Sequence, residues 1–95
     1  PVIAPPTAPT PPRNLRVVQI TGTRWDLSWM TDLRTSTRIE RAINTTTFTP
    51  YAMVSPGVLH TSTTVKRNDD YLFRIAAVNA AGMSDYSNTV FIGSR

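Results

Sequence analysis

Apolar and polar residues alternate with a period of two along most of the chain after residue 12. The clearest runs cover residues 25–29 and 71–77, and shorter ones cover residues 15–17, 37–41 and 90–92. Alternation of this kind is typical of strands that bury one face and leave the other in solvent. No stretch has the apolar stripe at 3.6-residue spacing that an amphipathic helix requires. The pattern therefore predicts an all-β protein.

Turn-forming residues separate these runs at regular intervals. Gly, Pro, Asn, Asp and Thr gather at residues 21–23, 31–32, 44–45, 55–57, 67–69 and 81–82. Several short strands separated by turns every 8–12 residues or so indicate an antiparallel sandwich or barrel. We expect seven strands in two packed sheets. The first, second and fifth strands form one sheet, and the fourth, third, sixth and seventh form the other.

One row of residues on each strand is predicted to face the space between the sheets. A slip of one residue would turn a whole row to solvent, so the alternation fixes the set. It comprises Leu15, Val17, Trp25, Leu27, Trp29, Ile39, Val54, Val65, Tyr71, Phe73, Ile75, Ala77, Val90 and Ile92. Trp25 and Trp29 share a face and resemble a sugar platform, but the same face is the predicted core, which is the interpretation we adopt.

The first residues have a different composition from the rest. Six of the eight prolines lie within residues 1–12. Proline has no N–H and a fixed φ, so such a run forms neither a ladder nor a helix. Residues 1–11 are therefore predicted to be a Pro/Thr-rich linker and residues 12–95 a folded domain, which we expect to be one module of a longer protein. Pro9 and Pro12 have PxxP spacing, so a ligand for an adaptor domain is the alternative.

Composition and charge limit the classes of partner. The 95 residues contain ten Lys and Arg against six Asp and Glu, a formal net charge of +4, and no Cys. The basic residues are scattered along the chain, whereas nucleic-acid binders gather them on one stripe or helix. We expect a solvated basic surface and no nucleic-acid partner, with weak anion binding as the alternative. No apolar run approaches the roughly 20 residues of a membrane helix, so no membrane insertion is expected.

Residues that could carry chemistry are sparse. His60 is the one histidine, and without Cys or a second His it has no partner for a metal site. Asp69 and Asp70 are adjacent on a predicted turn, where turn chemistry is the simpler explanation. Asn44 begins a glycosylation sequon, for which chance is the default. Tyr86 is the best candidate for a free aromatic. We expect no enzyme activity, no cofactor and no metal.

Several segments together resemble fibronectin type III domains. These are residues 12–17, Leu27-Ser28-Trp29, residues 38–42, Val65 with Tyr71 six positions later, residues 73–82, and Ser84 with residues 87–90. The resemblance covers residues 12–92. It implies an immunoglobulin-like, seven-stranded antiparallel β-sandwich with Trp29, Tyr71, Phe73 and Ile75 in the core.

The resemblance also implies a tyrosine corner, in which the Tyr71 hydroxyl bonds a backbone group within residues 65–68. The sequence departs from the family pattern at two places. Arg67-Asn68 stands where the family usually has Pro-Gly, although Asn tolerates the left-handed conformation that such a turn needs. Thr37 stands where the third strand often begins with an aromatic residue.

The sequences of the segments at residues 38–42, 77–82 and 86–88 are similar to those of modules attached to secreted bacterial multidomain proteins. The resemblance therefore implies a non-catalytic spacer and docking domain, secreted or at the cell surface, whose partners are neighbouring domains of the same chain. The alternative is an accessory module of a secreted enzyme that binds a carbohydrate or another surface ligand, such as a protein.

The sheet that contains the sixth strand has an outer row with an unusual composition. Its expected members are Arg38, Glu40, Leu72, Arg74, Val78 and Phe91. A contiguous apolar patch of a few hundred Å² usually marks an interface, so we expect this face to dock a neighbouring domain. The alternative is that Arg38 and Arg74 lay their methylene stems over the apolar residues and leave no patch.

Overall fold

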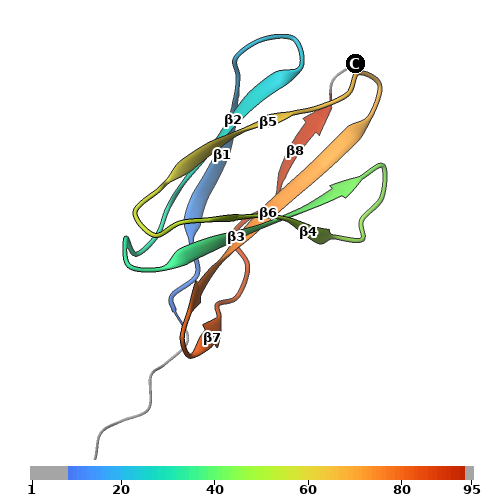
Figure 1. Cartoon of the computed structure of the whole chain (residues 1–95). Helices are drawn as coiled ribbons and strands as arrows, with labels where there is room; N and C mark the ends of the chain where they lie inside the picture. The colour runs from blue at the N-terminus through green and yellow to red at the C-terminus, as the bar shows by residue number, and fades with distance from the viewer. Residues whose placement is uncertain (1–8, 94–95) are drawn as a thin grey trace, which may run out of the picture.

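The computed structural model describes residues 9–93, which form two antiparallel sheets (Figure 1). The three-stranded sheet has the order β1 (Arg13–Gln19), β2 (Arg24–Met30) and β5 (His60–Thr64). The second sheet runs from β4 (Thr49–Val54) through β3 (Ser36–Ile43) to β6 (Asp70–Asn79), which also pairs with β7 (Gly82–Met83) and β8 (Val90–Gly93). The predicted fold class and sheet order are confirmed.

Within the described residues, the structure has one strand more than the seven predicted, because the short β7 precedes β8, and β8 corresponds to the predicted run at residues 90–92. In the segment between β7 and β8, two serine hydroxyls accept hydrogen bonds from β6 that the carbonyls of a regular strand would accept. The backbone N–H groups of Ser84 and Ser87 donate to the carbonyls of Ala77 and Ile75, both at 2.8 Å. In return, the N–H groups of Ala77 and Ile75 donate to the hydroxyls of Ser84 (2.9 Å) and Ser87 (3.1 Å). The segment therefore satisfies β6 without being a regular strand.

The core lies between the sheets and contains the predicted row. Trp29 is 3% exposed, and Phe73 and Ile75 are 0% exposed. Trp25, Val17, Val54 and Val90 are partly buried against this cluster. All remaining members of the predicted set are buried. The inward register is thus confirmed, and both tryptophans belong to the core cluster or its margin.

The predicted tyrosine corner is present where the chain crosses from β5 to β6. The backbone N–H of Lys66 donates to the Tyr71 hydroxyl at 2.9 Å. Asn68 has φ of +71°, so this turn uses asparagine for the left-handed position. Tyr71 is 3% exposed, and its ring stacks against Phe73 with centroids 6.2 Å apart.

The two ends of the described chain lie at opposite ends of the sandwich (Figure 1). Residues 9–12 form no strand, and β1 begins at Arg13. The linker predicted for residues 1–11 lies mostly outside the described residues. Within residues 9–93, no helix is long and apolar enough to cross a membrane.

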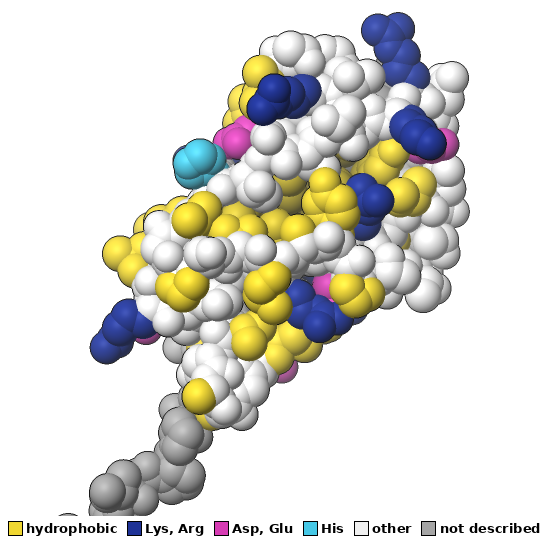
Figure 2. Space-filling view, viewed as in Figure 1, with side chains coloured by type: hydrophobic (Ala, Val, Ile, Leu, Met, Phe, Trp, Pro, Cys, Tyr) yellow, Lys and Arg dark blue, Asp and Glu magenta, His cyan; other side chains and the backbone are white. Residues whose placement is uncertain are grey.

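One lateral side of the molecule leaves part of the apolar interior visible. Figure 2 shows hydrophobic side chains in a band across the middle, where Figure 1 has β5 above β3 and β4. Tyr51 on β4 spans this side, because its hydroxyl lies 3.0 Å from the Thr63 hydroxyl on β5. Basic side chains stand apart from one another on the viewed face.

Candidate functional site

The predicted interaction face lies on the outer side of the second sheet. Cross-strand pairing places Glu40 of β3 beside Arg74 of β6, and Leu72 of β6 beside Phe91 of β8. Arg38 lies two residues from Glu40 on β3, and Val78 lies four residues from Arg74 on β6. The structure therefore brings all six residues onto one sheet face, although their environments differ sharply.

Glu40 is at the centre of this face and is only 4% exposed. Its Oε1 accepts hydrogen bonds from Arg74 Nε at 3.0 Å and Arg74 Nη2 at 2.9 Å. Its Oε2 accepts from Arg38 Nε at 2.9 Å and from the Tyr86 hydroxyl at 3.0 Å. Both carboxylate oxygens are thus used inside the chain, so Glu40 is not available to a partner.

Arg74 is held between two aromatic rings. Its guanidinium carbon lies 3.6 Å from the centroid of Tyr86 and 4.1 Å from that of Phe48. Cation–π contacts of this kind add to the ion pair with Glu40. The prediction that Tyr86 is a free aromatic is wrong, because its ring covers Arg74 and its hydroxyl donates to Glu40. No local sequence signal reports this contact, since Tyr86 and Glu40 are 46 residues apart.

The electrostatics of this group favour the charged carboxylate. Burial by itself raises the pKa of Glu40, because it removes water from the anion. Hydrogen bonds from Arg74, Tyr86 and Arg38 outweigh that effect, and the pKa of Glu40 is lower than its ordinary value. The side chains of Arg74 and Arg38 keep 28% and 35% exposure. The group therefore presents guanidinium edges, and not a carboxylate, to solvent.

The ion-paired group interrupts the expected apolar face. Toward one end of β6, Val78 is half-buried and pairs with Met83, which is 41% exposed. Toward the other end, Leu72 is half-buried and Phe91 is 60% exposed. Arg74 lies between these two areas in the register of β6. The exposed aromatic side chain, Phe91, is thus at the end of this face where the chain leaves β8.

Phe91 has a defined place on this surface because of Gly93. A Cβ built on Gly93 would lie 2.9 Å from both Cε1 and Cζ of the Phe91 ring. The ring therefore lies along β8 over the glycine, and any side chain at residue 93 would clash with it. Beside it is a pocket of about 350 Å³ lined by Asn44, Thr45, Thr46, Asp70, Leu72 and Phe91.

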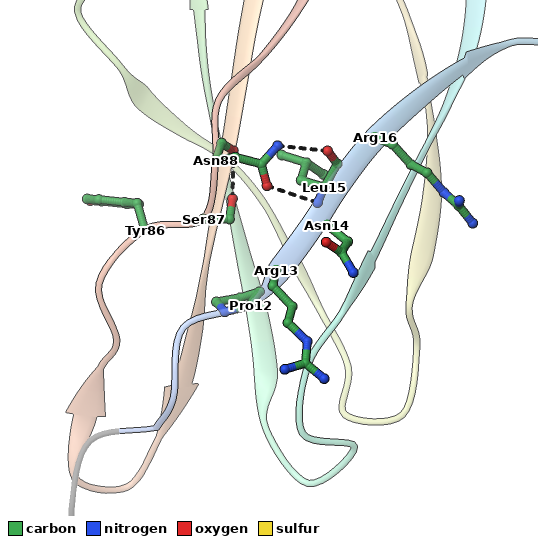
Figure 3. Close-up of a pocket in the computed structure, with 8 residues that line it drawn as sticks. All are labelled: Pro12, Arg13, Asn14, Leu15, Arg16, Tyr86, Ser87 and Asn88. Carbon is green, nitrogen blue, oxygen red and sulfur yellow. Dashed lines mark hydrogen bonds between the residues drawn. The ribbon is translucent and has the colours of Figure 1, made fainter.

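A second hollow lies between β1 and the segment that precedes β8 (Figure 3). Asn88 spans it: its Oδ1 accepts from Leu15 N at 3.1 Å and its Nδ2 donates to Leu15 O at 2.9 Å. Asn14 beside it has φ of +58° at a bulge of β1. In Figure 3, Tyr86 points away from these Asn88–Leu15 hydrogen bonds. Asn88 closes the sandwich here, a role that the sequence analysis missed.

The remaining chemical candidates lie elsewhere. His60 is on β5, with its Nδ1 3.7 Å from Asp26 and a side chain 72% exposed. Asp69 and Asp70 are held to the turn after β3, because Asn44 Nδ2 donates to Asp69 Oδ1 at 3.0 Å and Asn44 Oδ1 accepts from Asp70 N at 2.8 Å. Among residues 9–93, no three His, Cys, Asp or Glu side chains form a group that could hold a metal ion.

No family model matches the chain, and no curated protein matches it in sequence. Solved structures do match. The twitchin kinase region from C. elegans has a TM-score of 0.79 at 24% identity, over 92% of this chain. The present chain spans only 17% of that twitchin chain.

Two single-domain structures match over nearly their whole length. The FN5 domain of Drosophila Lar has a TM-score of 0.70 at 19% identity, covering 90% of this chain and 95% of that one. The fibronectin type III domain of a human fibronectin type III domain containing protein has a TM-score of 0.74 at 21% identity, covering 94% and 88%. Likeness at this identity concerns the fold alone, and on that ground the chain has the fibronectin type III fold.

Proposed function

We propose that this chain is a non-catalytic module of a larger, extracellular multidomain protein, in which it spaces and docks neighbouring domains. The observation that carries the proposal is the position of the chain ends. The described chain enters the sandwich beside β7 and leaves at the opposite end after β8 (Figure 1). Domains joined to the two ends would therefore be held apart by the length of the sandwich. The fold is also found as one domain of longer chains.

The docking part of the proposal rests on Leu72 and Phe91. Phe91 is 60% exposed and lies two residues before Gly93, the last described residue of β8. A domain that follows would meet this aromatic surface within a few residues of the exit. Exposed apolar surface of this kind favours contact with another protein surface.

The test is a Leu72→Lys, Phe91→Lys double variant in the full-length protein. Small-angle scattering should show that the neighbouring domain separates from the module, since two charges would have to be buried in the contact. The matched control is Val18→Lys, Ile20→Lys, which alters side chains that are 57% and 54% exposed and lie on or beside β1 in the other sheet. If the double variant and the control both keep the wild-type interdomain geometry, the module is a plain spacer and does not dock.

A carbohydrate-binding accessory module is the second candidate. It is favoured by the pocket beside Phe91, which combines an exposed aromatic ring with Asn44, Thr46 and Asp70. Aromatic rings and polar side chains together suit the faces and hydroxyls of a sugar. Pull-down on insoluble cellulose and chitin should retain the wild type and lose Phe91→Ala. Equal recovery of the two proteins in the unbound fraction would remove this candidate.

A further inference from the structure

A module that joins two domains carries any tension between them through its first and last strands. Figure 1 shows that β1 and β8 both run from the end where the chain enters toward the end where it leaves. Tension on the chain ends therefore pulls β1 lengthwise toward the entry end and β8 lengthwise toward the exit end. The hydrogen bonds of an antiparallel ladder lie perpendicular to its strands, so such a pull loads several of them at once.

The ladder between β1 and β2 is interrupted close to where this tension enters. Arg13 and Arg16 pair with β2, and a bulge lies between them. Leu15 is inside this gap, and the side chain of Asn88 bonds both its N–H, at 3.1 Å, and its C=O, at 2.9 Å (Figure 3). A side chain from the segment before β8 therefore holds β1 at the point where its own ladder is broken.

Asn88 is itself anchored on the second sheet. Ser87, the residue before it, donates from its N–H to the carbonyl of Ile75 at 2.8 Å, and its hydroxyl accepts from the Ile75 N–H at 3.1 Å. Ile75 is 0% exposed and lies in β6. The strand through which tension leaves, β8, begins two residues after Asn88. A continuous link therefore runs from Leu15 through Asn88 and Ser87 to a buried strand of the other sheet.

We propose that the Asn88 side chain is a mechanical clamp, which holds β1 to the second sheet when tension acts on the two ends of the chain. The inference rests on the proposed role of the module as a spacer between domains. The carboxamide uses its donor and its acceptor on the same residue, so β1 slides along its axis only when both bonds break. Leu15 is also 3% exposed, so sliding would draw an apolar side chain out of the core. The clamp thus couples release of β1 to opening of the sandwich.

A second asparagine offers a matched control away from this link. Asn44 Nδ2 donates to Asp69 Oδ1 at 3.0 Å, and Asn44 Oδ1 accepts from Asp70 N at 2.8 Å. These bonds join the turn after β3 to the start of β6, and their residues belong to neither β1 nor β8. Asn44 has φ of +56°, which glycine adopts without strain. Asn44→Gly therefore removes two side-chain hydrogen bonds and keeps the backbone conformation.

The test stretches the 95-residue chain by handles at its two ends and records its lifetime at constant force. Asn88→Ala should shorten this lifetime at least about tenfold, because two hydrogen bonds under tension are lost. Asn44→Gly should keep the lifetime within about twofold of the wild type, although both variants lose two bonds and are less stable in denaturant. A wild-type lifetime for Asn88→Ala would overturn the proposal. An equal shortening in both variants would also overturn it, because Asn88 would then be an ordinary stabilising residue.

A second variant tests the donor without truncating the side chain. Asn88→Asp keeps an acceptor for Leu15 N and places a carboxylate oxygen against Leu15 O, so its lifetime at neutral pH should be shorter than that of the wild type. An aspartic acid carboxyl has an ordinary pKa of about 3.9, and once protonated it can donate to Leu15 O. The lifetime of Asn88→Asp relative to the wild type should therefore rise on acidification to about pH 3. A ratio that does not change with pH would show that the bonds to Leu15 do not carry the tension.

These measurements separate the clamp from the proposed docking. They use the module without a neighbouring domain, so their outcome does not depend on whether Leu72→Lys, Phe91→Lys alters the interdomain geometry. In the full-length protein without tension, Asn88→Ala should give the scattering of the wild type. A shortened lifetime in Asn88→Ala together with an inert Leu72→Lys, Phe91→Lys variant would keep the clamp and remove docking. The reverse pair of results would remove the clamp alone.

Discussion

The two faces of β6 bury their side chains by different means. On the inner face, Tyr71, Phe73 and Ile75 are at most 3% exposed, and their carbon atoms pack in the apolar core cluster. On the outer face, Arg74 is sheltered by two aromatic rings and bonds the carboxylate of Glu40. The inner face is stabilised by removing apolar surface from water. The outer face depends on the specific pairing of charged and aromatic groups from four separate segments.

This difference indicates which positions of β6 and its neighbours tolerate substitution. Removing part of an inner side chain leaves a cavity that close-packed neighbours cannot fill. Removing a partner on the outer face returns the guanidinium groups to water, which they can reach. We therefore expect the energetic effect of substitution to fall from the inner face to the outer one.

The largest effect is expected for Phe73→Ala on the inner face. Phe73 is 0% exposed and contacts the rings of Tyr51 and Tyr71, so truncation should cost about 3–5 kcal/mol. That is a large part of the roughly 5–15 kcal/mol that stabilises a small domain. Chemical denaturation would measure it, with Val18→Ala as the exposed control. A cost below that of Val18→Ala would contradict the comparison.

An intermediate effect is expected for Tyr71→Phe, which keeps the ring and removes the hydroxyl. The N–H of Lys66 then loses its acceptor, at a cost of about 1–3 kcal/mol. The measurement is the denaturation midpoint, and Tyr51→Phe, whose hydroxyl meets Thr63 on the open side, is the matched control. Equal midpoints for wild type and Tyr71→Phe would show that the corner bond contributes nothing net.

The smallest effect is expected for Glu40→Gln, at about 1 kcal/mol near pH 7, because Arg38 and Arg74 retain access to water. This stability difference between wild type and Glu40→Gln should depend on pH in a characteristic way. The pKa of Glu40 is below its ordinary 4.5 in the folded chain, so its stabilisation is complete above that pH and is lost as pH falls through the native pKa. The stability difference between wild type and variant should therefore vanish on acidification below pH 4.5.

Other acids do not disturb this comparison. Hydrogen bonds from the backbone N–H and the side chain of Arg34 lower the pKa of Asp32, but Asp32 titrates in both proteins. A difference that stays constant from pH 7 to the acid limit would mean that the charge of Glu40 is not what stabilises the group.

Local pattern was sufficient to predict the inner face. Leu27 and Trp29 alternate with polar neighbours, Phe73 and Ile75 flank Arg74, and a strand of that pattern buries one row. The corner was also accessible through the resemblance to fibronectin type III domains, because Val65 and Tyr71 have that family's spacing and Asn68 suits a left-handed turn. These features depend on residues that are close together in the chain.

The outer face was predicted in outline but not in its contacts. Tyr86 was expected to be free, and Asn88 had no assigned role. Tyr86 meets Glu40 across 46 residues, and Asn88 meets Leu15 across 73. Ser84 and Ser87 bond β6 from a segment for which the pattern predicted no pairing. No local pattern reports such contacts, since each partner has ordinary neighbours in sequence.

The sequence by itself determined which residues face the core, where the turns fall, and that two sheets pack together, because water exclusion acts on every strand through its own alternation. Only the tertiary structure decided which outer side chains remain available. Glu40, Arg74 and Tyr86 become one hydrogen-bonded group, Phe91 stays exposed over Gly93, and β5 lies at the edge of its sheet. These outcomes depend on distances between segments remote in the chain, and hydrogen bonds and ion pairs form only when those segments come within about 3 Å of each other.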